Sequence, residues 1–477
     1  MKLSQLLKNV HVKNEYADRE ITFITDDSRK VGAGCAFVCI KGKRFDGHDA
    51  AAAAVEAGAA AVICEHSFCC DGEVIVEDTR TAFSLMCAAF FGEPSKRLKL
   101  IGVTGTNGKT TTTFLIKEIF DALGIKAGLI GTVKNMIGDR EEPSALTTPE
   151  SFALNKLFAE MAEAGCEYCV MEVSSQALAQ GRVAGCEFEA AVFSNLTRDH
   201  LDYHGTFGAY AAAKALLFTQ TKKAILNLDD PYWKLMADSC AGTAVTFSAR
   251  DPADYTASGV KLLHTCVEYD LLNKNKVPHI KVGIPGGFSV YNSLAAIAAL
   301  LELGFDETAV IDAIGKVRGV KGRIEVVPTG TDYAVIIDYA HSPDGLKNIL
   351  TAVRPITVGR ILTVFGCGGD RDKTKRPIMG AVAAELSDKI FVTSDNPRTE
   401  DPAAIVQDIL TGLTDAATPM HVEVDRTEAI RQALSEAQAG DTVVLAGKGH
   451  ETYQILNTGK IHYDEREIVK GILEGTI

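Results

Sequence analysis

The sequence predicts an α/β protein of three domains, and three observations support that prediction. First, 477 residues are too many for one hydrophobic core and correspond to about three domains of roughly 150 residues. Second, an apolar strand from residue 98 runs into a glycine-rich turn, and Gly108-Lys109-Thr110 opens the next helix. Third, strand-like and helical stretches alternate through the last third of the chain, which is typical of a parallel sheet covered by helices on both faces.

The composition is that of an ordinary globular protein, with 46% hydrophobic and 23% charged residues. A net charge of −13 disfavours a nucleic-acid surface, which needs a basic field. No stretch has the ~18 apolar residues of a membrane span, and the first residues lack a secretion signal. The twelve irregularly spaced cysteines suit reduced thiols, and Cys166-x-x-Cys169 suits core packing because no second pair follows at zinc spacing. We expect a cytoplasmic protein with small-molecule substrates, no nucleic acid and no membrane insertion, and a monomer.

The predicted elements follow the chain in order. The first domain, 1–97, has a strand running into a polar turn at 21–29, strands at 35–40 and 60–63, a helix at 47–57 and a linker at 93–97. The central domain, 98–328, has buried strands at 168–173, 190–194 and 223–228 and a helix at 291–303. A break near 328–330 begins the third domain, 329–477, with strands at 334–338, 361–365, 390–393, 421–424 and 442–446.

The turn at 105–110 is typical of a loop that binds phosphate. Its glycines let successive backbone N–H groups point at a polyanion, and the following helix adds the positive end of its dipole. Lys109 would reach the outer phosphates and the Thr110 hydroxyl would bind Mg²⁺. The strict pattern has glycine where this chain has Val103, so an ordinary strand–turn–helix is the alternative. We interpret the loop as an ATP site formed by Gly105, Thr106, Asn107, Gly108, Lys109, Thr110 and Thr111.

Two more polar residues follow predicted strands, at the edge where open α/β sheets bind ligands. Glu172 ends the strand at 168–173, and His200 lies beyond the strand at 190–194. An acid and a histidine near the phosphate loop could complete a magnesium shell. Histidine is an unusual ligand for a hard cation, so from spacing alone a structural role in the loop is the better interpretation of His200.

Five motifs read together resemble the Mur ligase family, the ATP-dependent ligases that build the peptide stem of the peptidoglycan precursor. They lie in order through the chain: Gly105-Thr-Asn-Gly-Lys-Thr110, Glu172-Val-Ser-Ser175, Asn195-Leu-Thr-Arg-Asp-His-Leu-Asp-Tyr-His-Gly205, Asp338-Tyr-Ala-His-Ser-Pro-Asp344 and Gly447-Lys-Gly-His-Glu451. The resemblance implies a UDP-binding first domain, a central ATP-binding domain with a P-loop-type parallel sheet, and a Rossmann-like C-terminal domain for the incoming amino acid. Within the family, the chain is most similar to members that add the third amino acid.

The resemblance also implies a mechanism. ATP phosphorylates the side-chain carboxylate of the D-glutamate of a UDP-muramoyl-dipeptide, and the incoming amine attacks the acyl phosphate. Thr110 and Glu172 would hold the nucleotide magnesium, with His200 in the metal shell and two Mg²⁺ ions in all. Lys214 would carry a CO₂-derived carbamate that acts as an oxygen ligand. From the residues alone, Lys214 in its apolar helix reads as a surface lysine with a buried stem.

Further binding residues are implied in the same way. For ATP these are Asn292 at the adenine, with Arg323 and Asp338 at the phosphate and ribose. Many members carry an aromatic residue where this chain has Ile324. His341 is either a general base or a loop-stabilising residue. The UDP-muramoyl-dipeptide would be held by Ser28, Thr147, Thr148, Ser174, Gln180 and Arg182, although 147–150 also reads as a helix N-cap.

The choice of amino acid depends on Asp395-Asn396-Pro397-Arg398, a pattern that the family's diaminopimelate-adding members carry. The planar fork of Arg398 would pair with the distal carboxylate of meso-diaminopimelate, a group that L-lysine lacks. The remaining contacts would come from Arg371, Asp395, Asn396, Gly447 and Glu451. The alternatives are a surface turn at 397–398, a ligase for L-lysine, a folylpolyglutamate-type ligase and a non-catalytic nucleotide-binding scaffold.

Overall fold

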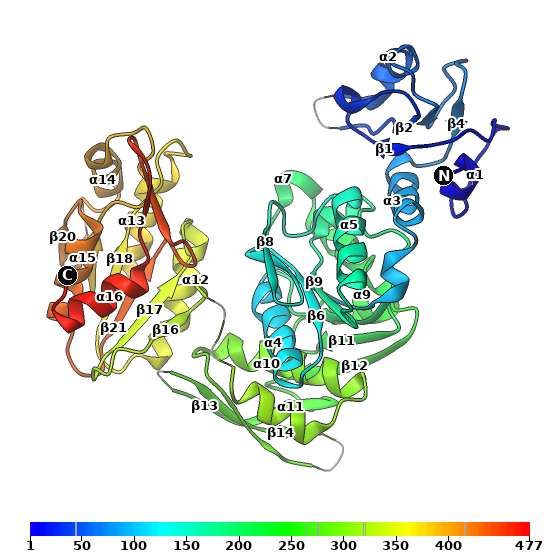
Figure 1. Ribbon diagram of the computed structural model, residues 1–477. Coiled ribbons are helices and arrows are strands. Elements are labelled where there is room, and N and C mark those ends of the chain that lie inside the picture. Colours follow the sequence, from blue (N-terminus) through cyan, green and yellow to red (C-terminus); the bar gives the residue numbers. More distant parts are fainter. Residues whose placement is uncertain (43–44, 264, 274–275, 318, 320, 415) are drawn as a thin grey trace. The chain divides into compact units, whose positions relative to one another are not determined.

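The computed structural model describes residues 1–477 except 43–44, 264, 274–275, 318, 320 and 415 (Figure 1). It divides into two compact units, one of residues 1–254 and 295–310 and the other of residues 255–294 and 311–477. The fold is α/β, as predicted, and the boundaries predicted at 98 and 329 stay predictions. Among the described residues, no helix is long and apolar enough to cross a membrane.

The N-terminal part of the first unit is a small parallel sheet. Its strands lie in chain order and are β1 (Phe23–Thr25), β2 (Cys35–Val38), β3 (Ala61–Cys64) and β4 (Glu73–Ile75). The helix predicted at 47–57 is present as a 3₁₀ turn, Gly47–Ala50, followed by α2 (Ala51–Glu56). Helix α3 (Thr79–Phe90) covers one face of this sheet. Asp78 caps its start by accepting hydrogen bonds from the backbone N–H groups of Arg80 and Thr81.

A larger sheet forms the body of the first unit. Its order is β12-β11-β10-β5-β9-β6-β7-β8, with parallel pairing from β12 through β6. The parallel strands are β5 (Lys99–Thr104), β6 (Ala127–Ile130), β9 (Tyr168–Glu172), β10 (Phe188–Phe193), β11 (Lys223–Asn227) and β12 (Thr243–Ser248). These strands include all those predicted for this region. They could be recognised in the sequence because a strand with apolar side chains on both faces forms a continuous apolar run. The antiparallel extension β7 (Lys134–Ile137) and β8 (Arg140–Pro143) was not predicted.

The parallel arrangement brings three strand ends together. Strand β5 lies between β9 and β10 in the sheet, and α4 (Lys109–Ala122) follows β5 after the glycine-rich turn. The carboxyl ends of these strands therefore present the turn, Glu172 and the segment after Phe193 at one edge. Cys166 and Cys169 are buried free thiols in the hydrophobic core of this unit, as the core interpretation predicted.

The second unit contains an antiparallel strand group and a mostly parallel sheet. The group is β13 (Tyr255–Leu262), β14 (Val267–Leu272) and β15 (His279–Val282). The sheet has the order β16-β17-β21-β18-β19-β20, in which only β16 (Glu325–Val327) pairs antiparallel among the described pairings. The other strands are β17 (Ala334–Asp338), β18 (Ile361–Phe365), β19 (Lys389–Val392), β20 (Met420–Val422) and β21 (Thr442–Ala446), at or within two residues of the predicted positions.

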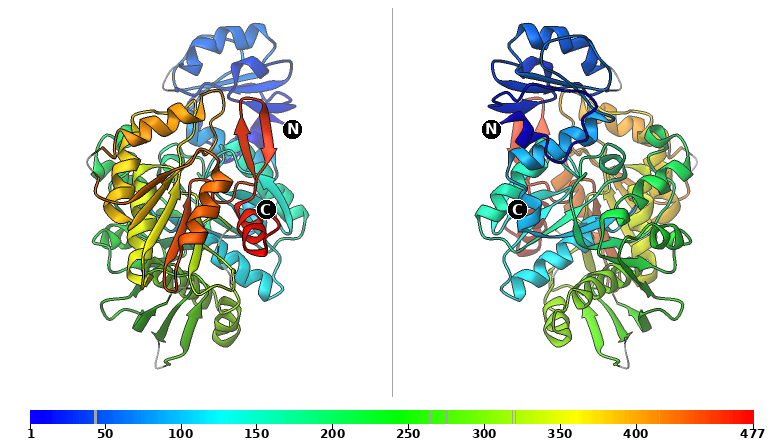
Figure 2. Two further views of the ribbon diagram at one scale, coloured as in Figure 1. Left: turned by 90° about the vertical axis from the view of Figure 1, so that its left-hand side faces the viewer. Right: turned by 90° about the vertical axis from the view of Figure 1, so that its right-hand side faces the viewer.

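Helices cover both faces of the C-terminal sheet, as predicted (Figures 1 and 2). Ile336, Val444 and Ala446 pack on one face with α12 (Pro343–Val353), α13 (Lys375–Leu386) and α14 (Pro402–Leu410). The alternate residues Val335, Ile337, Val443 and Leu445 pack on the other face with α15 (Arg426–Glu436) and α16 (Glu465–Glu474). A hairpin of β22 (Tyr453–Leu456) and β23 (Gly459–His462) follows the last sheet strand.

Burial of Glu118 on α4 generates a prediction about stability. Burial, and secondarily Asp121, raises the pKa of Glu118 from 4.5 to about 7. Between pH 4.5 and 7 the unfolded chain loses this proton while the folded protein keeps it, so stability falls as pH rises. Glu118→Gln should therefore raise the Tm at pH 8 by a few degrees and leave the Tm at pH 4.5 unchanged, since about 1 kcal/mol corresponds to roughly 2–4 °C.

The measurement is calorimetric unfolding at both pH values, with Glu163→Gln on the exposed side of α5 (Ser151–Glu163) as the matched control. Equal effects of Glu118→Gln at the two pH values would contradict the assignment.

Candidate active site

The glycine-rich loop after β5 is anchored to the end of β10. Gly105 has φ +146° and Gly108 φ +86°, conformations that favour glycine, and a Cβ atom on Gly105 would overlap Ser194 Oγ. The backbone N–H of Thr106 donates to the carbonyl of Asn195 at 2.8 Å, and that of Asn107 donates to its side-chain oxygen at 3.0 Å. The loop is therefore fixed by its neighbour strand as well as by its own glycines.

Two lysine ammonium groups meet at one carbonyl of this loop. Lys109 Nζ donates to the Gly105 oxygen and the Thr106 oxygen, each at 2.9 Å. Lys214, in α8 (Phe207–Ala215), reaches the Gly105 oxygen at 2.7 Å and is 1% exposed. Burial, and secondarily the charge of Lys109, lowers the pKa of Lys214 well below its ordinary value. The surface-lysine interpretation of Lys214 is wrong, because the apolar helix carries this side chain into the protein.

Glu172 is the acidic centre of the same edge and is 1% exposed. Its carboxylate accepts hydrogen bonds from Thr110 Oγ1 at 3.0 Å to both oxygens, from the Thr132 N–H at 2.8 Å and from the Thr132 hydroxyl at 3.0 Å. Gly131 leaves the space, since a Cβ atom there would lie 2.5 Å from Glu172 Oε1. The hydroxyl and the carboxylate are oxygen donors of the kind that a hard divalent cation prefers, so the pair fits a magnesium ion.

His200 lies on the loop before the short helix α7 (Leu201–His204). Its backbone is left-handed, with φ +51°, and its side chain is 45% exposed. Nε2 lies 3.4 Å from Asp199 Oδ2, and the ring meets the Tyr210 ring edge-on at 6.1 Å. In the described residues no group of three or more histidine, cysteine and acidic side chains is arranged to hold a metal. A metal role for His200 stays a prediction.

Five of the residues predicted to hold the muramoyl-dipeptide form one cluster beside Glu172. The Thr148 hydroxyl donates to the Glu172 carbonyl at 2.8 Å and accepts from the Ser174 N–H at 3.0 Å. The Arg182 guanidinium donates to the Thr148 carbonyl and to Gln180 Oε1, and burial lowers its pKa. Thr147 joins through the Thr132 hydroxyl at 3.0 Å.

The N-cap interpretation of 147–150 is only partly right. Helix α5 does begin just after this segment, but its N-cap residue is Glu150, whose side chain makes no capping hydrogen bond. Ser28, the sixth predicted residue, lies in a different place. It is on a 3₁₀ turn in the N-terminal sheet region and lines a hollow of about 590 Å³ with Asp26, Asp27, Arg29, Lys30 and Phe45.

The residues predicted for the adenine, ribose and phosphates belong to the second unit. Asn292 is 4% exposed on α10 (Gly287–Glu302). Asp338 accepts from the Ile324 N–H at 2.8 Å, and burial raises its pKa. The Arg323 guanidinium lies 5.4 Å from the centre of the Tyr339 ring, and no residue that the structure describes accepts a hydrogen bond from its buried Nε. That donor fits an anionic ligand.

His341 forms a bond within its own loop. Its Nδ1 lies 2.8 Å from the Tyr339 carbonyl, and the two rings are 4.6 Å apart. This bond agrees with the loop-stabilising interpretation, and the exposed Nε2 side of the ring leaves the general-base hypothesis open.

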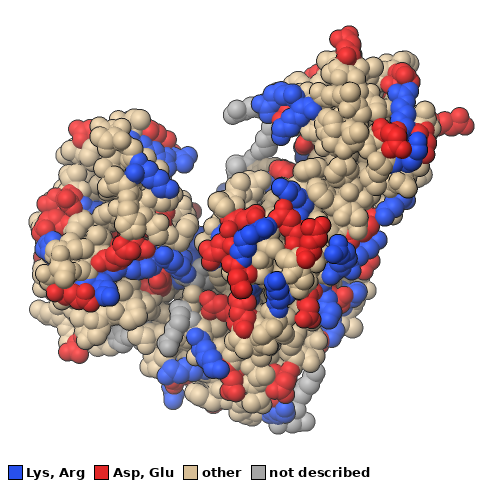
Figure 3. Space-filling model, in the orientation of Figure 1, with Lys and Arg blue, Asp and Glu red and all other residues tan. Residues whose placement is uncertain are grey.

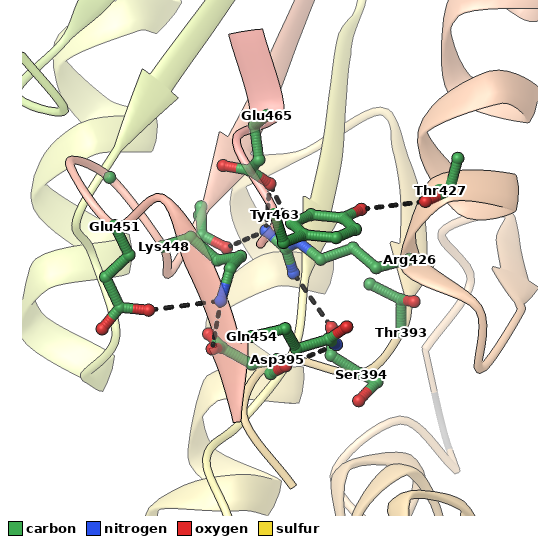
Figure 4. A network of polar contacts seen from close by, with 12 residues as sticks. Thr393, Ser394, Asp395, Arg426, Thr427, Lys448, Glu451, Gln454, Tyr463 and Glu465 are labelled. Carbon is green, nitrogen blue, oxygen red and sulfur yellow. Dashed lines mark hydrogen bonds and ion pairs between the residues drawn. The ribbon is translucent and has the colours of Figure 1, made fainter. Parts of the chain in front are cut away.

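The predicted amino-acid site surrounds the carboxyl ends of β19 and β21 (Figure 4). Asn396 Nδ2 donates to Glu451 Oε2 at 2.8 Å, and a Cβ atom on Gly447 would lie 2.5 Å from Asp395 Oδ2. Arg398 is partly exposed, with φ +55°, and its N–H donates to the Ile455 carbonyl at 3.0 Å. The segment 397–398 is thus tied to the β22 strand, and it also begins a turn in which the Glu400 N–H donates to the Pro397 carbonyl at 3.1 Å, so the surface-turn alternative stays open. Arg371 is exposed on the loop after β18.

Comparison with known proteins gives three domain matches along the chain. A Mur ligase family catalytic domain matches residues 20–83, a Mur ligase middle domain residues 103–300, and a Mur ligase glutamate ligase domain residues 322–449. The chain belongs to the Mur ligase family.

Individual Mur ligases match over the full length. The chain is 45% identical over 484 residues to UDP-N-acetylmuramoyl-L-alanyl-D-glutamate--2,6-diaminopimelate ligase 1 of Clostridium acetobutylicum, covering 99% of each chain. It is 45% identical to the 2,6-diaminopimelate ligase of Geobacillus kaustophilus, covering 95% of each. A solved structure of a UDP-N-acetylmuramoyl-L-alanyl-D-glutamate--2,6-diaminopimelate ligase aligns with TM-score 0.76 and 33% identity, covering 100% of this chain and 99% of that one.

Sequence reasoning missed several residues of this Mur ligase that contact predicted site residues, among them Thr132, Tyr210 and Lys448. Thr132 supplies two donors to Glu172, and the Tyr210 hydroxyl lies 3.0 Å from Thr106 Oγ1 while its ring lies 4.8 Å from Lys214 Nζ. Lys448 contacts Asn396 and Glu451. Lys448 lies inside the Gly447–Glu451 motif, and Tyr210 precedes Lys214 by one helical turn, so both positions carried a signal. No sequence motif or spacing pointed to Thr132.

The geometry of Gly105 generates a prediction about nucleotide binding. Gly105→Ala forces a Cβ atom onto Ser194 Oγ at a φ that alanine rarely adopts, so the loop must leave β10. We expect the Kd for ATP, measured by isothermal titration calorimetry, to rise about tenfold or more, because one or two hydrogen bonds to phosphate are lost. Gly124→Ala is the matched control, since Gly124 has φ +72° and open space around it. An unchanged Kd in Gly105→Ala would refute this account.

Proposed function

We propose that this chain joins meso-diaminopimelate to UDP-N-acetylmuramoyl-L-alanyl-D-glutamate, with ATP converted to ADP and phosphate. The observation that carries the proposal is the 45% identity over 99% of the chain to a relative named as a 2,6-diaminopimelate ligase. The half-buried Lys109 and the buried Glu172 and Lys214 at one sheet edge support it, because an inactive nucleotide-binding scaffold has no need to keep them.

In the first step the D-glutamate side-chain carboxylate attacks the γ-phosphorus of ATP, the bond to the β-phosphate oxygen breaks, and ADP leaves. The N–H groups at the start of α4 bind the phosphates, since those of Thr106 and Asn107 already donate to Asn195. Lys109 exchanges the Gly105 and Thr106 carbonyl oxygens for phosphate oxygens, which places a cation where charge develops. The cluster of Thr147, Thr148, Ser174, Gln180 and Arg182 orients the dipeptide, and Ser28 binds the uridine diphosphate.

In the second step an amino group of diaminopimelate attacks the acyl carbon, the tetrahedral intermediate loses phosphate, and an amide bond remains. Thr110 and Glu172 would hold the nucleotide magnesium, and His200 with carbamylated Lys214 a second magnesium. These ions neutralise phosphate charge when bound. Asn292, Arg323 and Asp338 hold the nucleotide, and His341 accepts a proton from the attacking amine.

Lys214 fits carbamylation because CO₂ reacts with a neutral amine. Burial lowers the pKa of Lys214, so its amine is neutral at a lower pH than an exposed lysine. The product is an anionic oxygen ligand formed on a side chain that reaches the phosphate loop.

We propose the cytoplasm as the location, since all twelve cysteines are free thiols, and a monomer as the active form. On the face shown in Figure 3, acidic and basic side chains are interspersed, which agrees with small-molecule substrates and no nucleic acid. A folylpolyglutamate-type ligase would not need the Asp395–Arg398 pattern, and L-lysine would leave Arg398 without a carboxylate.

Replacing Lys214 tests the carbamate. Lys214→Ala should lower kcat by about two orders of magnitude or more, because a ligand to transition-state charge is lost. Added acetate should restore part of the rate by supplying a carboxylate to the cavity. Lys117→Ala is the control, a second buried lysine, which pairs with Asp121 on α4 at 2.5 and 2.7 Å. Full activity of Lys214→Ala without additive would reject the carbamate.

Measurement of kcat/KM for meso-diaminopimelate and for L-lysine tests the proposed function and the role of Arg398. The wild type should prefer meso-diaminopimelate, and phosphate release should require the UDP-muramoyl-dipeptide. Arg398→Ala should raise the KM for meso-diaminopimelate by roughly two orders of magnitude, since the distal carboxylate loses its partner. L-lysine should gain little, because no new ammonium partner appears.

The control for Arg398 is Arg354→Ala, which removes an exposed arginine paired with Asp388 elsewhere on the same unit. A wild-type preference for L-lysine overturns the proposed substrate. An unchanged ratio in Arg398→Ala overturns the specificity role alone.

A further inference from the structure

Lys448 is a buried cation beneath the predicted amino-acid site. Its side chain is 0% exposed, and Nζ donates to Asn396 Oδ1 and to Glu451 Oε2, each at 3.2 Å. Asp395 Oδ1 lies 3.7 Å from the same nitrogen. One ammonium group therefore contacts three of the side chains predicted to bind diaminopimelate (Figure 4).

The residues that Lys448 joins come from two loops that are not neighbours in the sheet. Asp395 and Asn396 follow β19, and Lys448 and Glu451 follow β21, with β18 between these strands. Gly366 directly follows β18, and a Cβ atom there would overlap the Thr393 carbonyl, so the chain after the middle strand leaves room for the two loops to meet. Lys448 spans this gap and fixes the distance between the loops.

A second buried cation holds the backbone of the same two loops. The Arg426 guanidinium donates to the Ser394 carbonyl at 3.2 Å and to the Ala446 carbonyl at 2.9 Å, and it pairs with Glu465 at 2.8 Å. Arg426 therefore contacts the carbonyls at the loop bases, whereas Lys448 contacts the side chains of Asn396 and Glu451. Loss of Lys448 therefore removes a contact of these side chains while the backbone ties to Arg426 stay in place.

We propose that Lys448 is a positioning residue for the incoming amino acid, an inference that rests on the proposed function. Lys448 holds Glu451 through Oε2, which also accepts from Asn396 Nδ2, so that the other carboxylate oxygen is oriented toward the substrate ammonium group. The lysine itself is fully buried and does not touch substrate. It acts through Asn396 and Glu451.

The test is steady-state kinetics of the full-length enzyme with Lys448→Met, Glu451→Gln and the double variant. Lys448→Met should raise the KM for meso-diaminopimelate about tenfold or more, because a buried charge pair loses one partner. The KM values for ATP and for UDP-muramoyl-dipeptide should stay within about twofold. In the Glu451→Gln background the effect of Lys448→Met should be much smaller, since the two residues act as one unit.

The control is Arg360→Met, which removes the partner of buried Asp441 at the opposite end of the same sheet. It should lower stability without changing the KM for meso-diaminopimelate. If Lys448→Met raises all three KM values equally, or if its effect adds fully to that of Glu451→Gln, Lys448 is only structural and the inference is overturned. A wild type that does not use meso-diaminopimelate overturns the proposed function instead.

Lys448→Arg covers the case in which Lys448→Met does not fold. It keeps the charge, but the larger guanidinium displaces Asn396 and Glu451, so the KM for meso-diaminopimelate should still rise while that for ATP stays constant. An unchanged KM for meso-diaminopimelate in Lys448→Arg overturns the inference.

Discussion

The buried carboxylate of Glu172 is the constraint on which the first unit's site depends. Its hydrogen-bond partners at Thr110 and Thr132 are neutral donors, and its carbonyl accepts from Thr148. A buried carboxylate that is satisfied by hydrogen bonds alone remains costly, and a cation lowers that cost. Burying this carboxylate next to the glycine-rich loop therefore lowers the stability of the folded protein. A divalent cation carried in with a nucleotide would relieve both the carboxylate and the phosphates.

The two units accommodate buried polar side chains near the carboxyl ends of their parallel strands in a similar way. In each, a polar side chain at the end of a buried parallel strand is approached by a glycine that leaves room for it, Gly131 at Glu172 and Gly447 at Asp395. In each, a buried lysine reaches a loop of the site from another segment: Lys214 on α8 reaches the Gly105 carbonyl, and Lys448 reaches Asn396. Parallel topology brings the loops to one edge, and the buried cation determines how their polar groups are arranged.

The sequence predicted the strands that are buried on both faces, because their apolar runs are continuous. Ala334–Asp338 and Thr442–Ala446 were predicted to the residue. It missed β8 and the β22–β23 hairpin, whose pairing depends on the neighbouring strand; β8 and β23 also have mostly exposed side chains. The loops that carry the site followed from local motifs. The contacts that Thr132 and Lys448 make across strands could not be predicted from local motifs. Sequence spacing contains no information about which distant carboxylate a side chain will meet.

Ile324 stands where the resemblance to Mur ligases led us to expect an aromatic residue in many members, and the structure gives this position a physical context. Its φ of +44° is a left-handed conformation that a β-branched residue adopts only at a cost. The N–H of Ile324 donates to the buried carboxylate of Asp338, and Gly322 N–H donates to Glu325, so the turn is held from both sides. This turn places the Arg323 guanidinium over the Tyr339 ring with its buried Nε available to a ligand. The strain is located beside the arginine that we propose to bind an anionic ligand, and the interaction with Asp338 maintains it.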